Sequence, residues 1–83
     1  MENGISLMVM SPEMVLEECS VKLVRLPGRK GPFTVLKNHA PLISVLDAGD
    51  IEYETMSGEV KKINIKSGFV EVGKNKVSVC VEL

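Results

Sequence analysis

The sequence predicts an all-β domain, either a sandwich or a barrel of short antiparallel strands. Valine and isoleucine recur along the chain and often alternate with polar residues at a period of two, which is typical of half-buried strands. Turn-forming residues interrupt this pattern at regular spacing, and no segment sustains the period of an amphipathic helix. Because 83 residues supply material for one core only, we expect a single domain over residues 1–83.

The predicted strands are short, and each ends at a turn signal. Seven or eight can be delimited, and they cover residues 5–10, 14–26, 33–36 and 42–46, the two arms of a hairpin over 51–66, then 69–72 and 77–81. The second strand bends near residues 18–20 and stops at a loop over 27–32, where two prolines and two glycines demand a surface connection. Residues 47–50 and 73–75 are predicted turns, and residues 67–68 a break or bulge.

The hairpin over residues 51–66 has the best-defined predicted register. A two-residue loop would place Ile63 opposite Glu52, which mixes the apolar and charged faces of the two strands. A three-residue loop that includes Gly58 instead puts Ile51 on the face of Ile63 and turns the charged neighbours outward. We therefore predict the longer loop.

Composition and charge exclude several function classes. A formal net charge of -1 provides no global field to attract nucleic acid or anionic lipid. The longest apolar stretches fall well short of the roughly 20 residues that cross a bilayer, and residues 1–3 lack the features of a signal peptide, so we expect a cytoplasmic protein. In that compartment Cys19 and Cys80 are expected to stay reduced.

The sequence offers no recognisable catalytic, metal-binding or cofactor-binding set. His39 is the single histidine, and no partners that would complete a catalytic triad can be assigned to it. Two distant cysteines and one histidine do not supply the four close ligands of a structural zinc ion. The loop over 27–32 lacks the Lys-Ser/Thr pair and the following helix of a phosphate-binding loop. We expect no catalytic residue, no metal and no cofactor, which favours a binding or structural role.

Two other functions stay open on the residues alone. A small β-barrel adaptor could bind an anionic polymer through Arg25, Arg29 and Lys30, although the chain has few aromatic residues for stacking on bases. A small hydrolase could use His39 with Ser44 or Cys19, but it would need a carboxylate or amide to orient the imidazole.

One segment carries a specific resemblance to a known family. Residues 38–43 read Asn-His-Ala-Pro-Leu-Ile and precede Asp-Ala-Gly at 47–49. This stretch resembles the His-Ala-Pro-Leu motif of the epsilon subunit of F-type ATP synthases. Other matching stretches occur in family order with compatible spacing, so that the resemblance extends over residues 7–81. They are residues 8–13, residues 26–28 with Gly31, and residues 68–72 with Asn75, Val77 and Val79.

The resemblance implies a flattened antiparallel β-sandwich of about ten short strands in two sheets. It also implies a non-catalytic rotor subunit that links the gamma subunit to the c ring and couples ion translocation to ATP synthesis. Such a subunit has no active site, cofactor or nucleic-acid partner. It lies at the cytoplasmic face of the bacterial inner membrane and is attached there only through the complex.

The resemblance further implies which residues meet which partner. The positions that match the gamma-facing side are Ser11, His39, Ala40 and Ser44. The positions that match the loop approaching the c ring are Arg29, Lys30, Gly31 and Pro32. Asn38 precedes His39, and we expect it to belong to the same functional edge.

This sequence departs from the family pattern at several positions. Thr34 and Ser67 stand where the family usually has glycine, and Lys37 stands where it has proline. The loop over 27–32 is basic, whereas relatives often carry acidic residues there, which alters the electrostatics of the c-ring contact. The sequence stops at Leu83, before the two C-terminal helices of relatives, so we expect coupling without helical inhibition and without ATP binding.

Overall fold

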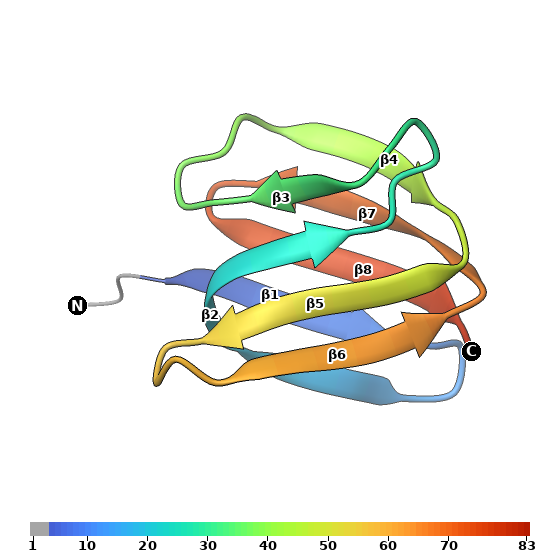
Figure 1. Cartoon of the computed structure of the whole chain (residues 1–83), viewed down its shortest axis with the longest axis horizontal. Coiled ribbons are helices and arrows are strands. Elements are labelled where there is room, and N and C mark those ends of the chain that lie inside the picture. Colours follow the sequence, from blue (N-terminus) through green and yellow to red (C-terminus); the bar gives the residue numbers. More distant parts are fainter. Residues whose placement is uncertain (1–3) are drawn as a thin grey trace.

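The computed structural model describes residues 4–83 as eight strands in two layers (Figure 1). In chain order these are β1 (Ile5–Met10), β2 (Val15–Leu26), β3 (Phe33–Val35), β4 (Leu42–Leu46), β5 (Gly49–Thr55), β6 (Val60–Ile65), β7 (Ser67–Gly73) and β8 (Lys76–Glu82). The predicted all-β sandwich is confirmed. Residues 1–3 of the predicted domain lie outside the described residues.

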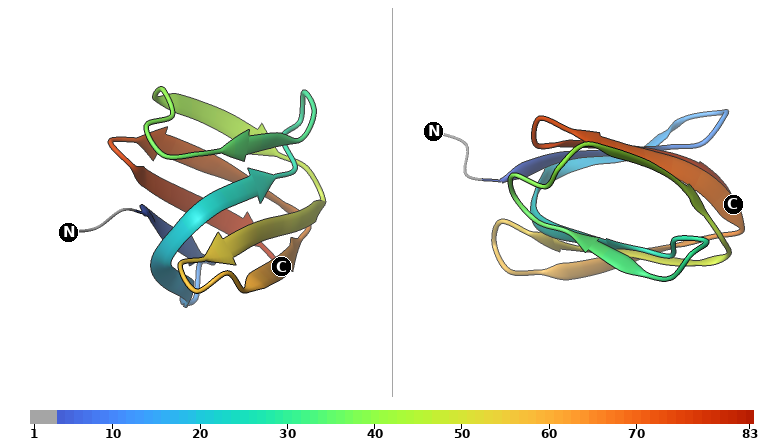
Figure 2. Two further views of the ribbon diagram at one scale, coloured as in Figure 1. Left: turned by 60° about the vertical axis from the view of Figure 1, so that its left-hand side comes forward. Right: turned by 90° about the horizontal axis from the view of Figure 1, so that it is seen from above.

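The two layers share one long strand. The β1 layer consists of β4, β7, β8, β1 and the first half of β2, and the β5 layer consists of β3, the second half of β2, β5 and β6. Figure 2 shows the two layers stacked with β2 passing from one to the other. The register shifts between Val21 and Leu23, and such a bulge bends and twists a strand so that it can change layer.

This arrangement corrects the expected strand number and sheet number. Residues 4–83 form eight strands rather than ten, and hydrogen bonds join all eight into one folded-over sheet rather than two. One pair is also parallel, because β1 lies beside β8 with Ser6 opposite Lys76 and Met10 opposite Cys80. A period of two reports which face a residue occupies but carries no information on which distant strand lies alongside.

The core lies between the layers and is built from the inward positions of both. Its buried side chains are Ile5, Leu7, Val9, Val21, Val24, Leu26, Val35, Leu46, Ile51, Tyr53, Ile65, Val70, Val72, Val77, Val79 and Val81. Burying one such side chain contributes about 1.5–3 kcal/mol, so the alternating strands supply the main stabilisation. Within the described range no charged side chain is buried, and the Tyr53 hydroxyl donates a 2.7 Å hydrogen bond to Glu17 Oε2.

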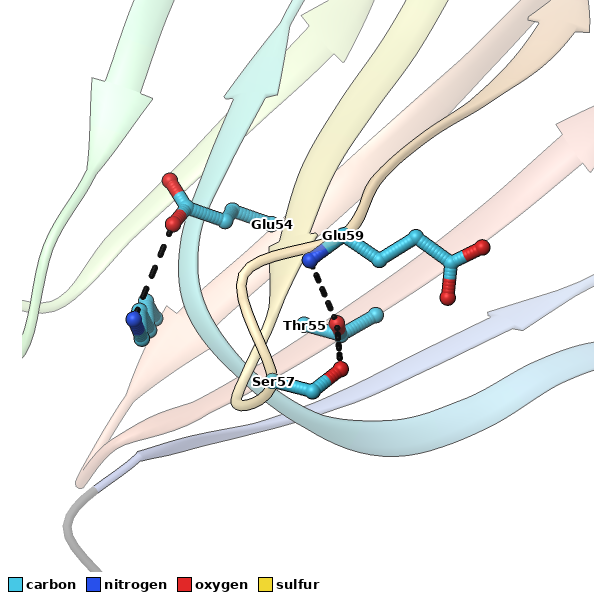
Figure 3. Close-up of polar contacts among 5 residues, drawn as sticks. Glu54, Thr55, Ser57 and Glu59 are labelled. Atoms are coloured by element: carbon cyan, nitrogen blue, oxygen red, sulfur yellow. Dashed lines mark hydrogen bonds and ion pairs between the residues drawn. The ribbon is translucent and has the colours of Figure 1, made fainter.

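The hairpin of β5 and β6 confirms the predicted three-residue loop. Ile51 pairs with Ile63 and Glu52 with Lys62, which is the register that separates apolar from charged side chains. The Gly58 N–H donates to the Thr55 carbonyl (2.9 Å), and Gly58 has a φ of 92°, a region that favours glycine. Figure 3 shows the Thr55 hydroxyl between Ser57 and Glu59, where its oxygen accepts the Glu59 N–H at 3.1 Å.

Three predicted boundaries differ from the structure. Gly49 and Asp50 already pair with β6, so the predicted turn over 47–50 is shorter than expected. Residues 67–68 are no break, because both pair regularly with β8. A Cβ atom on Gly68 would lie 2.5 Å from the Cys80 carbonyl oxygen, so that glycine serves close strand packing rather than a turn. Pairing of β2 changes at Val21, slightly beyond the predicted bend.

Candidate partner-binding surfaces

The outward side chains of the β1 layer form an apolar face. Strand register aligns one residue from each strand in a row across it, and this row contains Val45, Phe69, Cys80, Met10 and Val15. Phe69 is 52% exposed, Val15 50%, and Ile43, in the adjoining row, 75%. Large apolar side chains gathered on one face of a small monomer are typical of a surface that a partner covers.

A shallow groove of about 620 Å³ follows the apolar row. Met10, Phe69 and Cys80 lie along it, and Ser11 and Arg29 border it. The next rows carry charge, because Glu71 and Lys76 occupy outward positions on β7 and β8. The apolar face therefore has an apolar end beside Arg29 and a charged end beside the β7–β8 turn.

The outward side chains of the β5 layer form a charged face instead. Arg25 Nη1 lies 3.0 Å from Glu52 Oε2, and Glu52 stands opposite Lys62 in the strand register. Lys22 Nζ lies 3.7 Å from Glu54 Oε2. Positive and negative side chains alternate across neighbouring strands, so this face neutralises its own charges.

The loop over residues 27–32 is attached to the end of β4. The Arg29 N–H donates to the Val45 carbonyl (3.0 Å) and the Asp47 N–H donates to the Pro27 carbonyl (2.9 Å). Arg29 Nε also lies 3.1 Å from Asp47 Oδ1. Lys30, Gly31 and Pro32 are exposed beyond these contacts, and Gly31 has a φ of 124°.

These ion pairs bear on the proposed adaptor for an anionic polymer. Arg25 is paired with Glu52 on the charged face, and Arg29 is paired with Asp47 at the loop. Among the three basic residues that this hypothesis requires, Lys30 alone makes no ion pair within residues 4–83. The structure therefore assembles no concentrated basic patch from Arg25, Arg29 and Lys30.

The segment over residues 36–41 lies at the opposite end of β4. The Asn38 N–H donates to Asn75 Oδ1 (2.6 Å), and the His39 N–H donates to the Leu36 carbonyl (3.1 Å). His39 Nδ1 lies 2.7 Å from the Ala40 carbonyl oxygen, which can only accept, so Nδ1 carries the proton. Ala40 is exposed and His39 half-buried.

The predicted partner-binding residues thus form two groups rather than one site. Ser11 and the 27–32 loop lie together at one end of the apolar face, and Asn38, His39 and Ala40 lie at the other, separated by the five residues of β4. Ser44 lies between them. It pairs with the buried Val70 and therefore points to the core side of the strand, where its hydroxyl donates to the Val45 carbonyl at 3.2 Å.

The residues that sequence reasoning missed are the apolar ones on the outer face. The sequence pattern predicts Ile43, Val45 and Phe69 to be strand residues without a functional role, although each stands directly beside an inward apolar residue. The signal was available, because consecutive apolar residues in a short strand indicate that both faces of that strand become covered.

A polar cluster of Glu17, Cys19 and Tyr53 lies near the start of β2, with Tyr53 buried and the other two half-buried. The hydrogen bond from Tyr53 holds the pKa of the Glu17 carboxyl below its usual value. Burial raises the pKa of the Tyr53 hydroxyl, and the Glu17 carboxylate raises it further. Burial likewise raises the pKa of the Cys19 thiol, which makes it a poor nucleophile. This cluster holds β2 to β5 and is suited to stability rather than to catalysis.

Neither metal-binding nor membrane-spanning features stand out in the described part of the chain. Residues 4–83 contain no group of three or more His, Cys, Asp or Glu side chains placed to hold a metal ion. None of the elements in that range is a helix that could cross a bilayer. Cys19 and Cys80 are unbonded thiols.

Comparison with known proteins decides the family. Residues 4–83 match the model of the β-sandwich domain of the ATP synthase delta/epsilon chain. The chain belongs to this family. The resemblance to the epsilon family is thereby confirmed, and the β-sandwich description agrees with the two layers.

Curated relatives are bacterial ATP synthase epsilon chains. That of Desulfitobacterium hafniense is 43% identical over 82 residues, which cover 99% of this chain and 61% of the relative. That of Syntrophomonas wolfei is 36% identical, covering 98% of this chain and 59% of the relative. The chain therefore spans about three fifths of the length of these epsilon chains.

Solved structures of ATP synthases contain the same fold. A chain of the Euglena gracilis mitochondrial ATP synthase, solved with its F1 sector and c-ring, has a TM-score of 0.89 at 21% identity, over 94% of this chain and 50% of that one. A chain of the Tetrahymena thermophila central stalk and c-ring structure has a TM-score of 0.81 at 13% identity, over 99% of this chain and 66% of that one. Both show that the same fold occurs at low sequence identity.

Proposed function

We propose that the chain is a single epsilon-type domain, residues 1–83, that acts as a non-catalytic rotor subunit in the central stalk of a bacterial F-type ATP synthase. It links the gamma subunit to the c ring at the cytoplasmic face of the membrane and keeps ion translocation coupled to ATP synthesis. Family membership and the epsilon chains among its relatives support this assignment.

The apolar face is the observation that supports a permanent partner best. Its central row is apolar on all five strands that cross it, and Phe69 and Val15 in that row are about half exposed. Interfaces of obligate partners have such apolar centres with polar rims, and here Arg29 and Glu71 border the apolar region. We assign this face to the gamma subunit.

The loop over 27–32 is assigned to the c ring. Its first half is held against β4 by two backbone hydrogen bonds and the Arg29–Asp47 ion pair, so its exposed tip projects from a rigid base. Lys30, Gly31 and Pro32 form that tip, and Lys30 supplies the available positive charge. A rigidly held tip suits a contact that transmits torque.

Co-expression with the gamma subunit of the same organism tests the first assignment. We expect a 1:1 complex that survives size-exclusion chromatography at micromolar concentration, with an interface of roughly standard size, about 1,600 Å² in total. Separate elution of the two folded proteins would reject the assignment to gamma.

The variant Lys30→Glu tests the c-ring assignment in the assembled enzyme. Proton pumping per ATP hydrolysed should fall, whereas the ATPase activity of the detached catalytic sector should stay unchanged. Lys62→Glu, on the charged face, is the matched control and should leave pumping intact. Equal pumping by both variants, with equal melting temperatures, would rule out Lys30 as a coupling contact.

A further inference from the structure

Two asparagines far apart in the sequence form a reciprocal pair. The Asn38 N–H donates to Asn75 Oδ1 at 2.6 Å, and Asn75 Nδ2 donates to Asn38 Oδ1 at 3.2 Å. The Asn75 carbonyl also accepts the Ser6 N–H at 2.9 Å. One residue of the β7–β8 turn thereby joins the segment over 36–41 to the start of β1.

The backbone of both asparagines is shaped for this pairing. Asn38 has a φ of 66° and Asn75 a φ of 59°, in the left-handed region that asparagine tolerates better than most residues. Lys74 has a φ of 51°, so that Lys74 and Asn75 form a two-residue turn with positive φ at both positions. Such a turn favours asparagine or glycine but does not require a side chain at Asn75.

The pair is the main tether of the segment that carries His39. The other hydrogen bonds made by residues 37–40, as far as residues 4–83 are concerned, are local, from the His39 N–H to Leu36 and from the His39 ring to Ala40. Asn38 and Ala40 are exposed, so core packing holds this segment only weakly. Without the two bonds to Asn75, these residues would have to be ordered when a partner binds.

We propose that Asn75 is a positioning residue for partner binding. It holds residues 37–40 in the conformation that presents His39 and Ala40 beside the charged end of the apolar face. This proposal rests on the proposed docking of gamma to that face. Asn75 acts through Asn38, and its removal weakens binding because the segment must then be ordered at the moment of association.

The variant Asn75→Gly removes the tether and leaves the turn intact, because glycine is equally suited to a positive φ. Lys74→Gly is the matched control, since it deletes a side chain and adds the same backbone freedom at the neighbouring turn position. Asn75→Asp keeps an oxygen that can accept the Asn38 N–H. We would measure amide hydrogen exchange of Asn38, the melting temperature, and the Kd for gamma by calorimetric titration.

We expect Asn75→Gly to speed exchange of the Asn38 amide by at least about tenfold and to weaken gamma binding by roughly tenfold. Its melting temperature should equal that of Lys74→Gly. Lys74→Gly and Asn75→Asp should bind within about twofold of the original protein. In a His39→Ala background, Asn75→Gly should weaken binding much less, because the two residues act as one unit.

Three outcomes would overturn the proposal in different ways. Unchanged exchange at Asn38 in Asn75→Gly means that the tether does not hold the segment. Faster exchange with unchanged affinity means that the tether exists but does not position a binding residue. Failure of the original protein to bind gamma at all rejects the docking assignment and the positioning role together, while the exchange data still report on the tether itself.

Discussion

The two outer faces of this sandwich cover one common core, but their outward side chains differ in charge and polarity. On the β5 layer, outward positions alternate in charge: Arg25 forms an ion pair with Glu52, and Lys62 stands opposite Glu52 on the next strand. On the β1 layer, the central outward row is apolar on every strand. Since the core is built from the inward positions, the residue types at the outward positions are better evidence of function. A face that pairs its own charges needs no partner in water, whereas large apolar side chains gathered on one face are typical of a surface that a partner covers.

The largest expected effect comes from placing a charge on each face in turn. Phe69 and Val60 are nearly equally exposed, at 52% and 55%, but Phe69 lies on the apolar face and Val60 on the charged face. We expect Phe69→Glu to weaken gamma binding by about 100-fold, since a carboxylate must be desolvated at the centre of an interface. Val60→Glu should change the Kd by less than about twofold. Calorimetric titration measures both, and a reversed ranking would exchange the roles of the two faces.

The next effect concerns the hydrogen bond that joins the layers beneath both faces. Tyr53→Phe removes the bond to Glu17 and should lower the free energy of unfolding by about 1–2 kcal/mol near neutral pH. Gamma binding should be unchanged, because neither outer face is altered. Urea unfolding followed by circular dichroism measures the difference, and weaker binding with unaltered stability would contradict this separation of interior and surface.

The same variant has a defined pH dependence. The folded-state pKa of Glu17 is lowered, so its contribution to stability is present above the ordinary glutamate pKa and lost as pH falls through the folded value. The folded-state pKa of Tyr53 is raised, so its contribution is present below the ordinary tyrosine pKa of about 10 and lost as pH rises above it. The difference in free energy of unfolding between the original protein and Tyr53→Phe should therefore be largest near neutral pH. It should shrink at both acidic and alkaline pH.

A smaller effect is expected from reversing one charge on the charged face. Glu52→Lys replaces a carboxylate between Arg25 and Lys62 with a third positive charge. We expect the free energy of unfolding to fall by about 0.5–1 kcal/mol at low salt and by less at 1 M salt, since these side chains are partly exposed and screened. Unchanged gamma affinity should accompany the loss, and a salt-independent loss would show that packing rather than charge is responsible.

The smallest effect is expected at the Arg29–Asp47 pair, which lies at the border between the faces. Both side chains are more than half exposed, at 64% and 53%, so exchanging them in Arg29→Asp with Asp47→Arg should alter the melting temperature by no more than a degree or two. The two backbone hydrogen bonds hold the loop in either case. A large fall in the melting temperature would mean that the ion pair, rather than the backbone, anchors the 27–32 loop.

Much of this molecule was determined by local sequence. Short apolar runs that end at turn signals predict β1 and β4 closely. Alternation of apolar and polar residues predicts the β5–β6 hairpin, because the side chains of a strand alternate between its two faces whatever its partners. The three-residue loop followed from the same rule, since a two-residue loop would place Ile63 opposite Glu52, whereas the three-residue loop keeps Ile51 and Ile63 together on the core side. The motif at residues 38–43 was sufficient to indicate the family.

Tertiary structure alone decided which strands lie together and hence which residues share a surface. The parallel pairing of β1 with β8 brings Met10 beside Cys80, and no local pattern encodes a contact between the two ends of the chain. Likewise, Asn38 meets Asn75 and Arg29 meets Asp47 only after the sheet has folded over itself. Side-chain periodicity determines the face that a residue occupies, whereas long-range packing of the buried faces determines the neighbours that it finds there.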